Sequence, residues 1–323
     1  MVRGGSVISS SETCRPATCV DVVIVSYNSR DRLRACVEPL LATDGVDVVV
    51  VDNASADGSL DEIRDLPLKP IQLDRNGGFA HGVNVGWRAS SAPYVLLLNP
   101  DARIDRASLH ALVAALDGTA EAGAAAPRIL HDDGSLDYSQ RRFPRLRSTY
   151  AQALFLHRLF PAAPWTDELV RDARAYEQRG LPDWVSGACV LVRRSVLEEL
   201  DGLDEGFFMY GEDIDLCKRM RSLGYAVLFE PAAVVRHEGG ASAPRARLLP
   251  VLAASRVRYA VKHRSRAAAF LERLGIALGA ATHMVAGRGG RAARAGHARA
   301  LRDALTLRVT ASQAARAGDG SLA

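Results

Sequence analysis

The 323-residue sequence lacks an apolar run of about 18 residues, the length that a membrane-spanning helix needs. Residues 1–18 are polar and rich in serine, without the apolar centre of a secretory signal peptide, and we expect them to be disordered. Cysteine is scarce: the five cysteines are odd in number and lack the paired spacing of a zinc site. We therefore expect reduced thiols and a cytoplasmic chain.

Acidic residues are almost absent after residue 240, where only Glu272, Asp303 and Asp319 occur among many arginines. A basic tail of this kind favours an anionic partner such as a membrane surface, a lipid phosphate or nucleic acid, or is a solvated helical face. The tail has only Tyr259 and Phe270 as aromatic residues, which argues against stacking on bases and so against nucleic acid.

Hydrophobic periodicity predicts alternating strands and helices from residue 20 to residue 98. The expected strands are 20–26, 46–51, 70–73 and 94–98. Such alternation favours an α/β fold, with a mostly parallel sheet flanked by helices and a Rossmann-like nucleotide-binding half. We expect this domain to span 19–242, with an irregular excursion at 138–182, and a basic helical C-terminal extension to span 243–323.

Polar residues follow four of the predicted strands, where the carboxyl ends of parallel strands form a ligand-binding rim. They are Ser26-Tyr27-Asn28, Asp52-Asn53, Asp74-Arg75-Asn76 and Asn99-Pro100-Asp101. A carboxylate at Asp52 suits a base or ribose, or an Asx turn with Ser55. Asp101 is placed to meet Mg²⁺ or Mn²⁺, with substrate phosphate and a further ligand such as His237.

A cluster of acids, Glu212-Asp213-Ile214-Asp215, opens a predicted helix. Acids in a first turn are favoured by the helix dipole, so simple capping is one interpretation. The functional interpretation makes Asp213 a general base, with Asp215 turned away toward a loop or a basic side chain. The aromatic loop before it, which includes Tyr210, either shapes a sugar pocket or belongs to the core.

The sequence resembles family 2 glycosyltransferases with the GT-A fold, and more narrowly their bacterial rhamnosyltransferase-like branch. The motifs that carry the resemblance occur in the family's order over residues 20–240: VVIVSYNS, VVDNASADGS, RNGGFAHGVNVG, LLLNPDA, VSGACVLVRR, GLDEGFFMYGEDIDLCKR and RHEGG.

The resemblance implies a role for each matching residue. Nucleotide or donor binding falls to Ser26, Asn28, Asp52, Arg75, Asn76, Asn99, Gly187 and Ala188. Asp101 and His237 would hold the metal, although Asn99 replaces the first acid of the family's Asp-X-Asp motif. Asp213 would be the catalytic base, and Trp184, Tyr210 and Glu212 would shape the acceptor side.

The implied reaction is a metal-dependent, inverting transfer of a sugar, with dTDP-L-rhamnose as the expected donor. The expected acceptor is a glycan or polyprenyl-linked hydroxyl in cell-envelope polysaccharide synthesis, at the inner face of the membrane. The basic extension would meet that anionic surface through residues such as Phe270 and Leu274.

Alternatives stay open at this point. They are a UDP- or GDP-sugar transferase of the same fold, a non-catalytic nucleotide-sugar-binding relative, and a nucleotidyltransferase. Nucleotidyltransferases usually carry a glycine-rich basic loop near the first strand, and the segment VSYNSRDR does not resemble such a loop.

Overall fold

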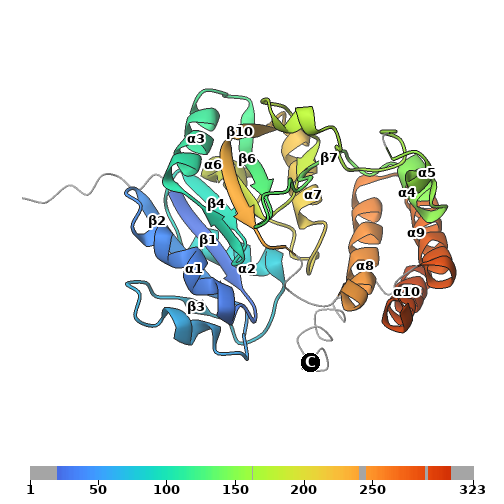
Figure 1. Ribbon diagram of the computed structural model, residues 1–323, viewed down its shortest axis with the longest axis horizontal. Helices are drawn as coiled ribbons and strands as arrows, with labels where there is room; N and C mark the ends of the chain where they lie inside the picture. Colours follow the sequence, from blue (N-terminus) through green and yellow to red (C-terminus); the bar gives the residue numbers. More distant parts are fainter. Residues whose placement is uncertain (1–19, 162, 240–244, 288–289, 307–323) are drawn as a thin grey trace, which may run out of the picture.

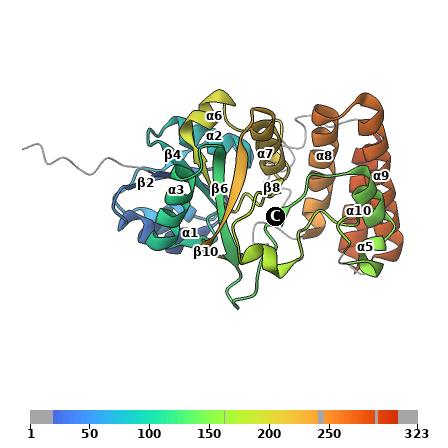
Figure 2. The same cartoon turned by 90° about the horizontal axis from the view of Figure 1, so that it is seen from above.

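The computed structural model describes residues 20–161, 163–239, 245–287 and 290–306, and the predicted disorder of 1–18 lies outside these ranges. A sheet with helices on both faces forms one side of the molecule, and a group of C-terminal helices stands beside it (Figures 1 and 2). The elements up to residue 130 are β1 (Val20–Ser26), α1 (Arg30–Leu41), β2 (Val46–Asp52), the 3-10 helix η1 (Ser59–Ile63), β3 (Ile71–Gln72), α2 (Phe79–Arg88), β4 (Tyr94–Leu98), β5 (Ala102–Ile104), α3 (Arg106–Asp117) and β6 (Ala122–Leu130).

The remaining elements complete the sheet and build the helical side. They are β7 (Gln140–Arg141), α4 (Leu146–Ala153), α5 (Leu156–Leu159), the 3-10 helix η2 (Ala173–Tyr176), β8 (Trp184–Val185), β9 (Cys189–Arg193), α6 (Arg194–Glu199), α7 (Glu212–Ser222), β10 (Ala226–His237), α8 (Arg245–His263), α9 (Arg266–Ala286) and α10 (Gly290–Leu305).

The main sheet has eight strands in the order β3-β2-β1-β4-β9-β6-β10-β5. The pairs β2–β3, β1–β2, β1–β4 and β6–β10 are parallel, which confirms the predicted mostly parallel sheet. Strand β9 runs antiparallel to both β4 and β6, and β5 runs antiparallel to β10. The short strands β7 and β8 form a separate pair.

Strand β1 divides the core into two, because successive side chains of a strand point to opposite faces. Val22 and Ile24 pack with α1 and α3 on one face, whereas Val23 and Val25 pack with α2, α6 and α7 on the other. Every residue of β1 is buried. The apolar run Val22–Val25 therefore belongs to a strand covered on both sides.

Two glycines allow helix α2 to lie directly on β1. A Cβ atom at Gly82 would come within 2.6 Å of Val25, and one at Gly86 within 2.4 Å of Val23. Part of the glycine-rich stretch thus serves packing between helix and sheet.

The segment 138–182, which carries little sequence signal, reaches across to the C-terminal helices. Helix α4 packs against α9, where Gly275 lies against Thr149 and Tyr150, and the Thr282 hydroxyl donates to the carbonyl of Ala153. The predicted boundary near residue 242 stays a prediction, but α4 belongs in space with the extension.

Helix α8 is held to the sheet-containing part by buried ion pairs. Asp215 on α7 has no exposed surface and lies 2.7 Å from each of Arg219, Lys262 and His263. Asp204 pairs with Arg258 at 2.8 Å and with Lys262 at 2.7 Å. Of the two partners predicted for Asp215, a loop or a basic side chain, the structure shows basic side chains, and two of them, Lys262 and His263, join the extension to α7.

Within the described residues, no helix combines the length and the apolarity needed to cross a bilayer. Cys36, Cys189 and Cys217 are buried and unpaired, as the sequence predicts.

Candidate active site

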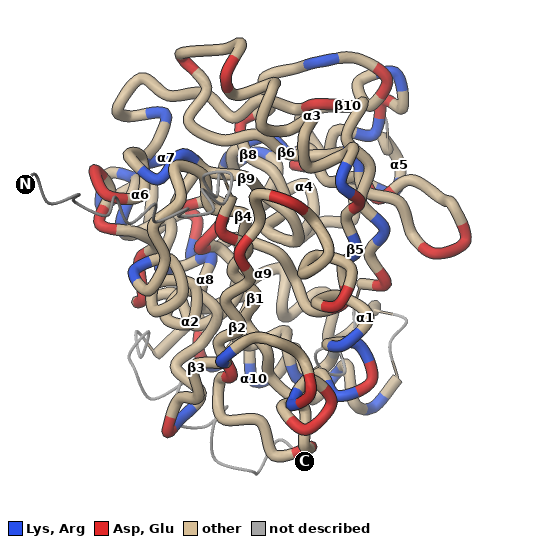
Figure 3. Tube along the Cα trace, turned by 90° about the vertical axis from the view of Figure 1, so that its left-hand side faces the viewer, with Lys and Arg blue, Asp and Glu red and all other residues tan. Residues whose placement is uncertain are grey.

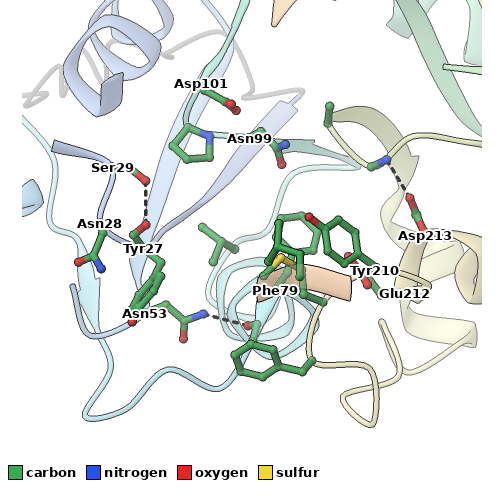
Figure 4. Close-up of a pocket in the computed structure, with 18 of the residues that line it drawn as sticks. Tyr27, Asn28, Ser29, Asn53, Phe79, Asn99, Asp101, Tyr210, Glu212 and Asp213 are labelled. Atoms are coloured by element: carbon green, nitrogen blue, oxygen red, sulfur yellow. Dashed lines mark hydrogen bonds between the residues drawn. The ribbon is translucent and has the colours of Figure 1, made fainter. Parts of the chain in front are cut away.

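A pocket of about 280 Å³ opens beyond the carboxyl ends of β1, β2 and β4. Figure 4 shows Tyr27, Asn28 and Asn53 on one side of it and Glu212 and Asp213 on the opposite side, with Asn99 and Asp101 between. Each of the four predicted rim motifs thus contributes at least one residue to one cavity. Its wall comprises Val25, Tyr27, Asn28, Ser29, Arg32, Asn53, Asn76, Gly78, Phe79, Asn99, Pro100, Asp101, Ser186, Gly187, Ala188, Phe208, Met209, Tyr210, Glu212, Asp213, His237 and Leu248.

The loop after β1 is fixed by a chain of hydrogen bonds that begins at Asp52. The Asp52 carboxylate is buried and accepts hydrogen bonds from the backbone N–H and the hydroxyl of Ser55. Ser55 Oγ in turn accepts a hydrogen bond from the Asn28 backbone N–H. Asn28 is in the left-handed region at φ 50°, which an Asn side chain tolerates. Asp52 therefore shapes the wall that Asn28 forms, as the Asx-turn interpretation holds.

The glycine at position 78 brings the loop before α2 against the aromatic loop. Gly78 has φ 90°, and a Cβ atom there would lie 2.3 Å from the carbonyl oxygen of Phe208. The carbonyl of Gly78 accepts a hydrogen bond from Asn53 Nδ2, and Asn76 Oδ1 accepts one from the Gly78 N–H. Only glycine fits at position 78, where the two loops cross, and the crossing forms part of the pocket wall.

The end of β4 meets the end of β10 at Asp101 and His237. His237 Nε2 lies 3.2 Å from Asp101 Oδ1 and 3.4 Å from Asn99 Nδ2, while Nδ1 lies 3.9 Å from Asp137 Oδ2. Burial by itself lowers the pKa of His237, but the carboxylates of Asp101 and Asp137 raise it to about 9. The opposite charge of His237 lowers the pKa of Asp101, although burial acts against this.

This pair suits a divalent cation that shares its coordination with a substrate. Among the described residues there is no group of three or more His, Cys, Asp or Glu side chains able to hold a metal by itself. Asp101 supplies an oxygen ligand and His237, once a metal has displaced its proton, a nitrogen ligand, with the two atoms 3.2 Å apart. Mg²⁺ commonly takes one or two protein ligands together with substrate phosphates, so the residues fit a metal–diphosphate site.

Glu212 and Asp213 are the first two residues of helix α7, and they lie on the opposite wall of the pocket. The chain reaches them through Tyr210 at φ 65° and Gly211 at φ 98°, both in the left-handed region. Asp213 Oδ2 accepts a hydrogen bond from the Gly187 N–H at 3.3 Å. Burial raises the pKa of Asp213, while hydrogen bonds from the backbone of Ile214 and Gly187 and the charge of Arg141 act in the opposite direction.

Glu212 is buried beside Asp213, and its Oε2 atom has no hydrogen-bond partner. Burial and then the neighbouring Asp213 charge raise the pKa of Glu212 well above its usual range. Unlike Glu212 Oε2, both carboxylate oxygens of Asp213 accept hydrogen bonds, from the backbone N–H groups of Ile214 and Gly187, and these bonds favour its ionised form.

Arg141 lies outside the pocket wall but acts on Asp213 through its charge, and the sequence did not single it out as part of the site. It pairs with Trp184 across β7 and β8, and its guanidinium lies over the Trp184 ring at 5.1 Å from the centroid. Its Nε atom is buried without a hydrogen-bond partner, and its charge lowers the pKa of both Asp213 and Asp137. In the sequence, Arg141 is one of four arginines between residues 141 and 147, and nothing there distinguishes it from the other three.

Most of the predicted site residues line the pocket, but four do not. Asn28, Asn76, Asn99, Asp101, Gly187, Ala188, Tyr210, Glu212, Asp213 and His237 are in its wall. Ser26, Asp52, Arg75 and Trp184 are outside the wall, and their roles stay predictions. Leu248 from α8 was missed, because an apolar residue in a helix carries no sequence mark of a site.

A family model described as Glycosyl transferase family 2 matches residues 21–201. The chain is 33% identical over 239 residues to N-acetylglucosaminyl-diphospho-decaprenol L-rhamnosyltransferase of Mycobacterium tuberculosis, across 69% of this chain and 77% of that protein. It is 27% identical over 234 residues to Rhamnosyltransferase WbbL of Escherichia coli, across 66% of this chain and 81% of that protein.

Two solved structures share the fold. Mannosyltransferase PcManGT from Pyrobaculum calidifontis, in complex with GDP-Man and Mn²⁺, has a TM-score of 0.56 at 18% identity and covers 91% of this chain and 88% of its own. GalNAc-T7 with UDP, GalNAc and Mn²⁺ has a TM-score of 0.53 at 16% identity, over 78% of this chain and 51% of its own. Both likenesses support the predicted fold class.

Proposed function

The chain belongs to glycosyl transferase family 2, and from that membership we propose that it transfers L-rhamnose from dTDP-L-rhamnose to a polyprenyl-linked glycan. Glycosyltransferase activity follows from the family, whereas the sugar and the acceptor are inferred. The observation that carries the inference is the 33% identity, over 77% of the relative's length, to a rhamnosyltransferase named for a decaprenol-linked substrate.

The pocket supports a single displacement with inversion. Asp213 lies on the wall opposite Asn28 and Asn53, so a donor held by its nucleotide on that side presents its sugar toward the carboxylate (Figure 4). Asp213 takes the proton from the acceptor hydroxyl as the oxygen attacks the anomeric carbon, and the bond to the diphosphate breaks on the far face. Its raised pKa makes it a stronger base than an exposed aspartate.

Asp101 and His237 would hold Mg²⁺ or Mn²⁺ together with the donor diphosphate. When bound, the cation supplies positive charge against the charge that develops on the leaving group. The side chains of Asp101 and His237 would keep the diphosphate oriented. The backbone N–H of Asn99 donates a hydrogen bond of 2.9 Å to the carbonyl of Ala188 and so holds the turn at Gly187 and Ala188, which would lie beside the sugar.

We expect turnover of dTDP-L-rhamnose, with polyprenyl-diphospho-N-acetylglucosamine as acceptor, to exceed turnover of UDP-glucose or GDP-mannose by at least about tenfold. A pocket that hydrogen-bonds one sugar leaves its polar groups unpaired with another, and this penalty lowers kcat/KM. The measurement is product formation from a donor panel, with Mn²⁺, with Mg²⁺, and with a chelator, which should abolish turnover.

Asp101→Ala serves as the matched variant in this panel, and it should lose most of the response to Mn²⁺. Preference for a UDP- or GDP-sugar would replace the rhamnose assignment while leaving the family intact. Full turnover in the presence of the chelator would remove the metal from the mechanism. The folded protein binding no nucleotide-sugar would contradict the proposed reaction altogether.

Arg141→Gln is expected to move the acid limb of the kcat–pH profile to higher pH. The Arg141 charge lowers the pKa of Asp213, so its loss raises that pKa and leaves less carboxylate at a given acidic pH. The profile of kcat against pH measures the shift, and Arg141→Lys, which keeps the charge, should shift it less. An unchanged limb in folded Arg141→Gln would mean that Arg141 does not tune the base.

The cytoplasmic, membrane-peripheral location expected from the sequence stays a prediction. A polyprenyl-linked acceptor would be presented at a bilayer surface, so the enzyme needs a means of approaching one.

A further inference from the structure

Helix α9 carries an apolar stripe that faces away from the rest of the molecule. Residues of an α-helix follow one another at about 100° around its axis, which puts Phe270, Leu274, Leu278, Val285 and Leu271 within about 100° of one another. All five are exposed, Phe270 to 58% and Val285 to 74%. The charged residues of α9, Arg266, Glu272 and Arg273, lie outside this stripe.

The opposite side of α9 is the buried one. Ala269, Ala277 and Ala280 are buried, and Ala280 packs in a small core with Ala253 of α8 and Ala300 of α10. Ile276 of the same helix also packs against this core. Small side chains fill the interior while large ones face outward, the reverse of an ordinary surface helix.

The α4–α5 segment extends the apolar surface on one flank of the stripe. Helix α4 contacts α9 through Gly275, Gly279 and Thr282, and the Phe155 ring lies 4.3 Å from that of His283. Just beyond, large apolar side chains are exposed at Leu154, Leu159, Phe160 and Trp165. In Figures 1 and 2, α9 and α5 lie at the end of the molecule away from the sheet.

The other flank is basic. Helix α10 is joined to α9 through Arg273, which donates to the carbonyls of Ala304 and Leu305. Its exposed charged side chains are arginines: Arg291, Arg294, Arg299 and Arg302. Asp303, paired with Arg302 at 3.5 Å, is the sole acidic residue of the helix. Elsewhere the signs are mixed, as the interspersed acidic and basic residues of the sheet-containing part show in Figure 3.

We propose that this surface, hereafter the docking face (the α9 stripe, the exposed apolar residues of 154–165 and the α10 arginines), binds an anionic phospholipid bilayer. Apolar side chains that include Phe and Trp suit the boundary between headgroups and acyl chains, and flanking arginines suit anionic lipid phosphates. A second copy of the chain would bring one set of α10 arginines near another, whereas lipid phosphates neutralise them.

Helix α8 connects the docking face to the pocket. Helix α8 packs against both α9 and α10, and its Leu248 forms part of the pocket wall. A bilayer bound to α9 and α10 therefore lies against the same helical group that borders the pocket. The inference rests on the proposed function in one respect: a bilayer in this place would give a lipid-linked acceptor a path to the pocket. Binding of the bilayer does not depend on which sugar is transferred.

The test is flotation of the full-length chain with vesicles of phosphatidylcholine alone or of phosphatidylcholine with phosphatidylglycerol. We expect the wild type to float with the anionic vesicles, to float less at high salt, and to stay unbound with neutral ones. The double variant Phe270→Ser/Leu274→Ser should reduce the bound fraction at least about tenfold. Its matched control is Leu181→Ser/Leu223→Ser, which changes exposed leucines (61% and 44%) outside the docking face and should float like the wild type.

Donor hydrolysis without acceptor, measured on the same proteins, separates this proposal from the proposed function. Equal hydrolysis by the wild type and Phe270→Ser/Leu274→Ser, with flotation lost only in the variant, supports the docking face whichever donor is used. Wild-type protein that ignores anionic vesicles, or a double variant that floats like the wild type, overturns it. A wild-type dimer that the double variant dissociates, seen by analytical ultracentrifugation without lipid, would assign the stripe to a second copy instead.

Discussion

Asp213→Asn should lower kcat by about 10²- to 10⁴-fold, the range that a positioned general base contributes. The asparagine keeps the shape of the side chain and can still meet the Gly187 N–H through its carbonyl oxygen, but it cannot accept the proton of the acceptor hydroxyl. The dissociation constant of the donor should change little, because Asp213 lies across the pocket from Asn28 and Asn53 (Figure 4). Single-turnover transfer and donor titration measure the two quantities separately.

The pH dependence adds a second readout for the same residue. Burial raises the pKa of Asp213, so the carboxylate and with it kcat should be lost at a higher pH than for an exposed aspartate as the solution is acidified. Asp201→Asn is the control, because Asp201 is an exposed aspartate on the loop before α7 and should leave kcat unchanged. A kcat within threefold of the wild type for folded Asp213→Asn would show that another group takes the proton.

Asp215→Asn should destabilise the fold by about 3 kcal/mol, since it leaves buried cations without their counter-charge. The Asp215 carboxylate has no exposed surface and lies between Arg219, Lys262 and His263. For a chain of 323 residues the loss corresponds to a fall in Tm of about 4–5 °C, because the entropy of unfolding grows with chain length. Thermal unfolding followed by circular dichroism measures it, and Asp61→Asn, which breaks an exposed ion pair with Arg64, should lower Tm by little.

The effect of Asp215 should depend on pH in a defined direction. Burial acts to raise its pKa, but hydrogen bonds from His263 and Lys262 and the charge of Arg219 lower it below its ordinary value. The folded pKa then lies below the unfolded one, so the stabilisation is complete above the unfolded pKa, near 3.9, and disappears as the pH falls through the folded pKa. An Asp215→Asn Tm equal to that of the wild type at pH 7 would mean that the cations find other partners.

Elements buried on both faces were the most predictable from the sequence. Strand β4 is a continuous apolar run and β1 is one apart from Asp21 and Ser26; polar residues follow both, and both begin and end where the pattern indicates. Asp101 and Asp213 were identified because an acid after a buried strand or in a first helical turn has a fixed direction. Backbone geometry placed these side chains, so local sequence was enough.

Elements that depend on distant contacts were predicted poorly. Strand β10 continues to His237 across an irregularity between Glu230 and Val234, so no unbroken apolar run in the sequence marks its full length. Pro231 interrupts the pattern there, and the strand resumes because β6 and β5 continue to pair with it. Helix α4 was hidden for a similar reason, because its stability comes from α9, more than 100 residues later in the chain.

The ionic joint between α7 and α8 bears on how members of this family can be recombined. A chimera that takes the sheet-containing part from one protein and its C-terminal helices from another would separate Asp204 and Asp215 from Arg258, Lys262 and His263. It would also exchange Leu248, and with it part of the pocket wall. Exchanging all the C-terminal helices is therefore a substitution within the active enzyme, and a crossover in the turn at residues 264–265, after α8, is the one that keeps these ion pairs and Leu248 together.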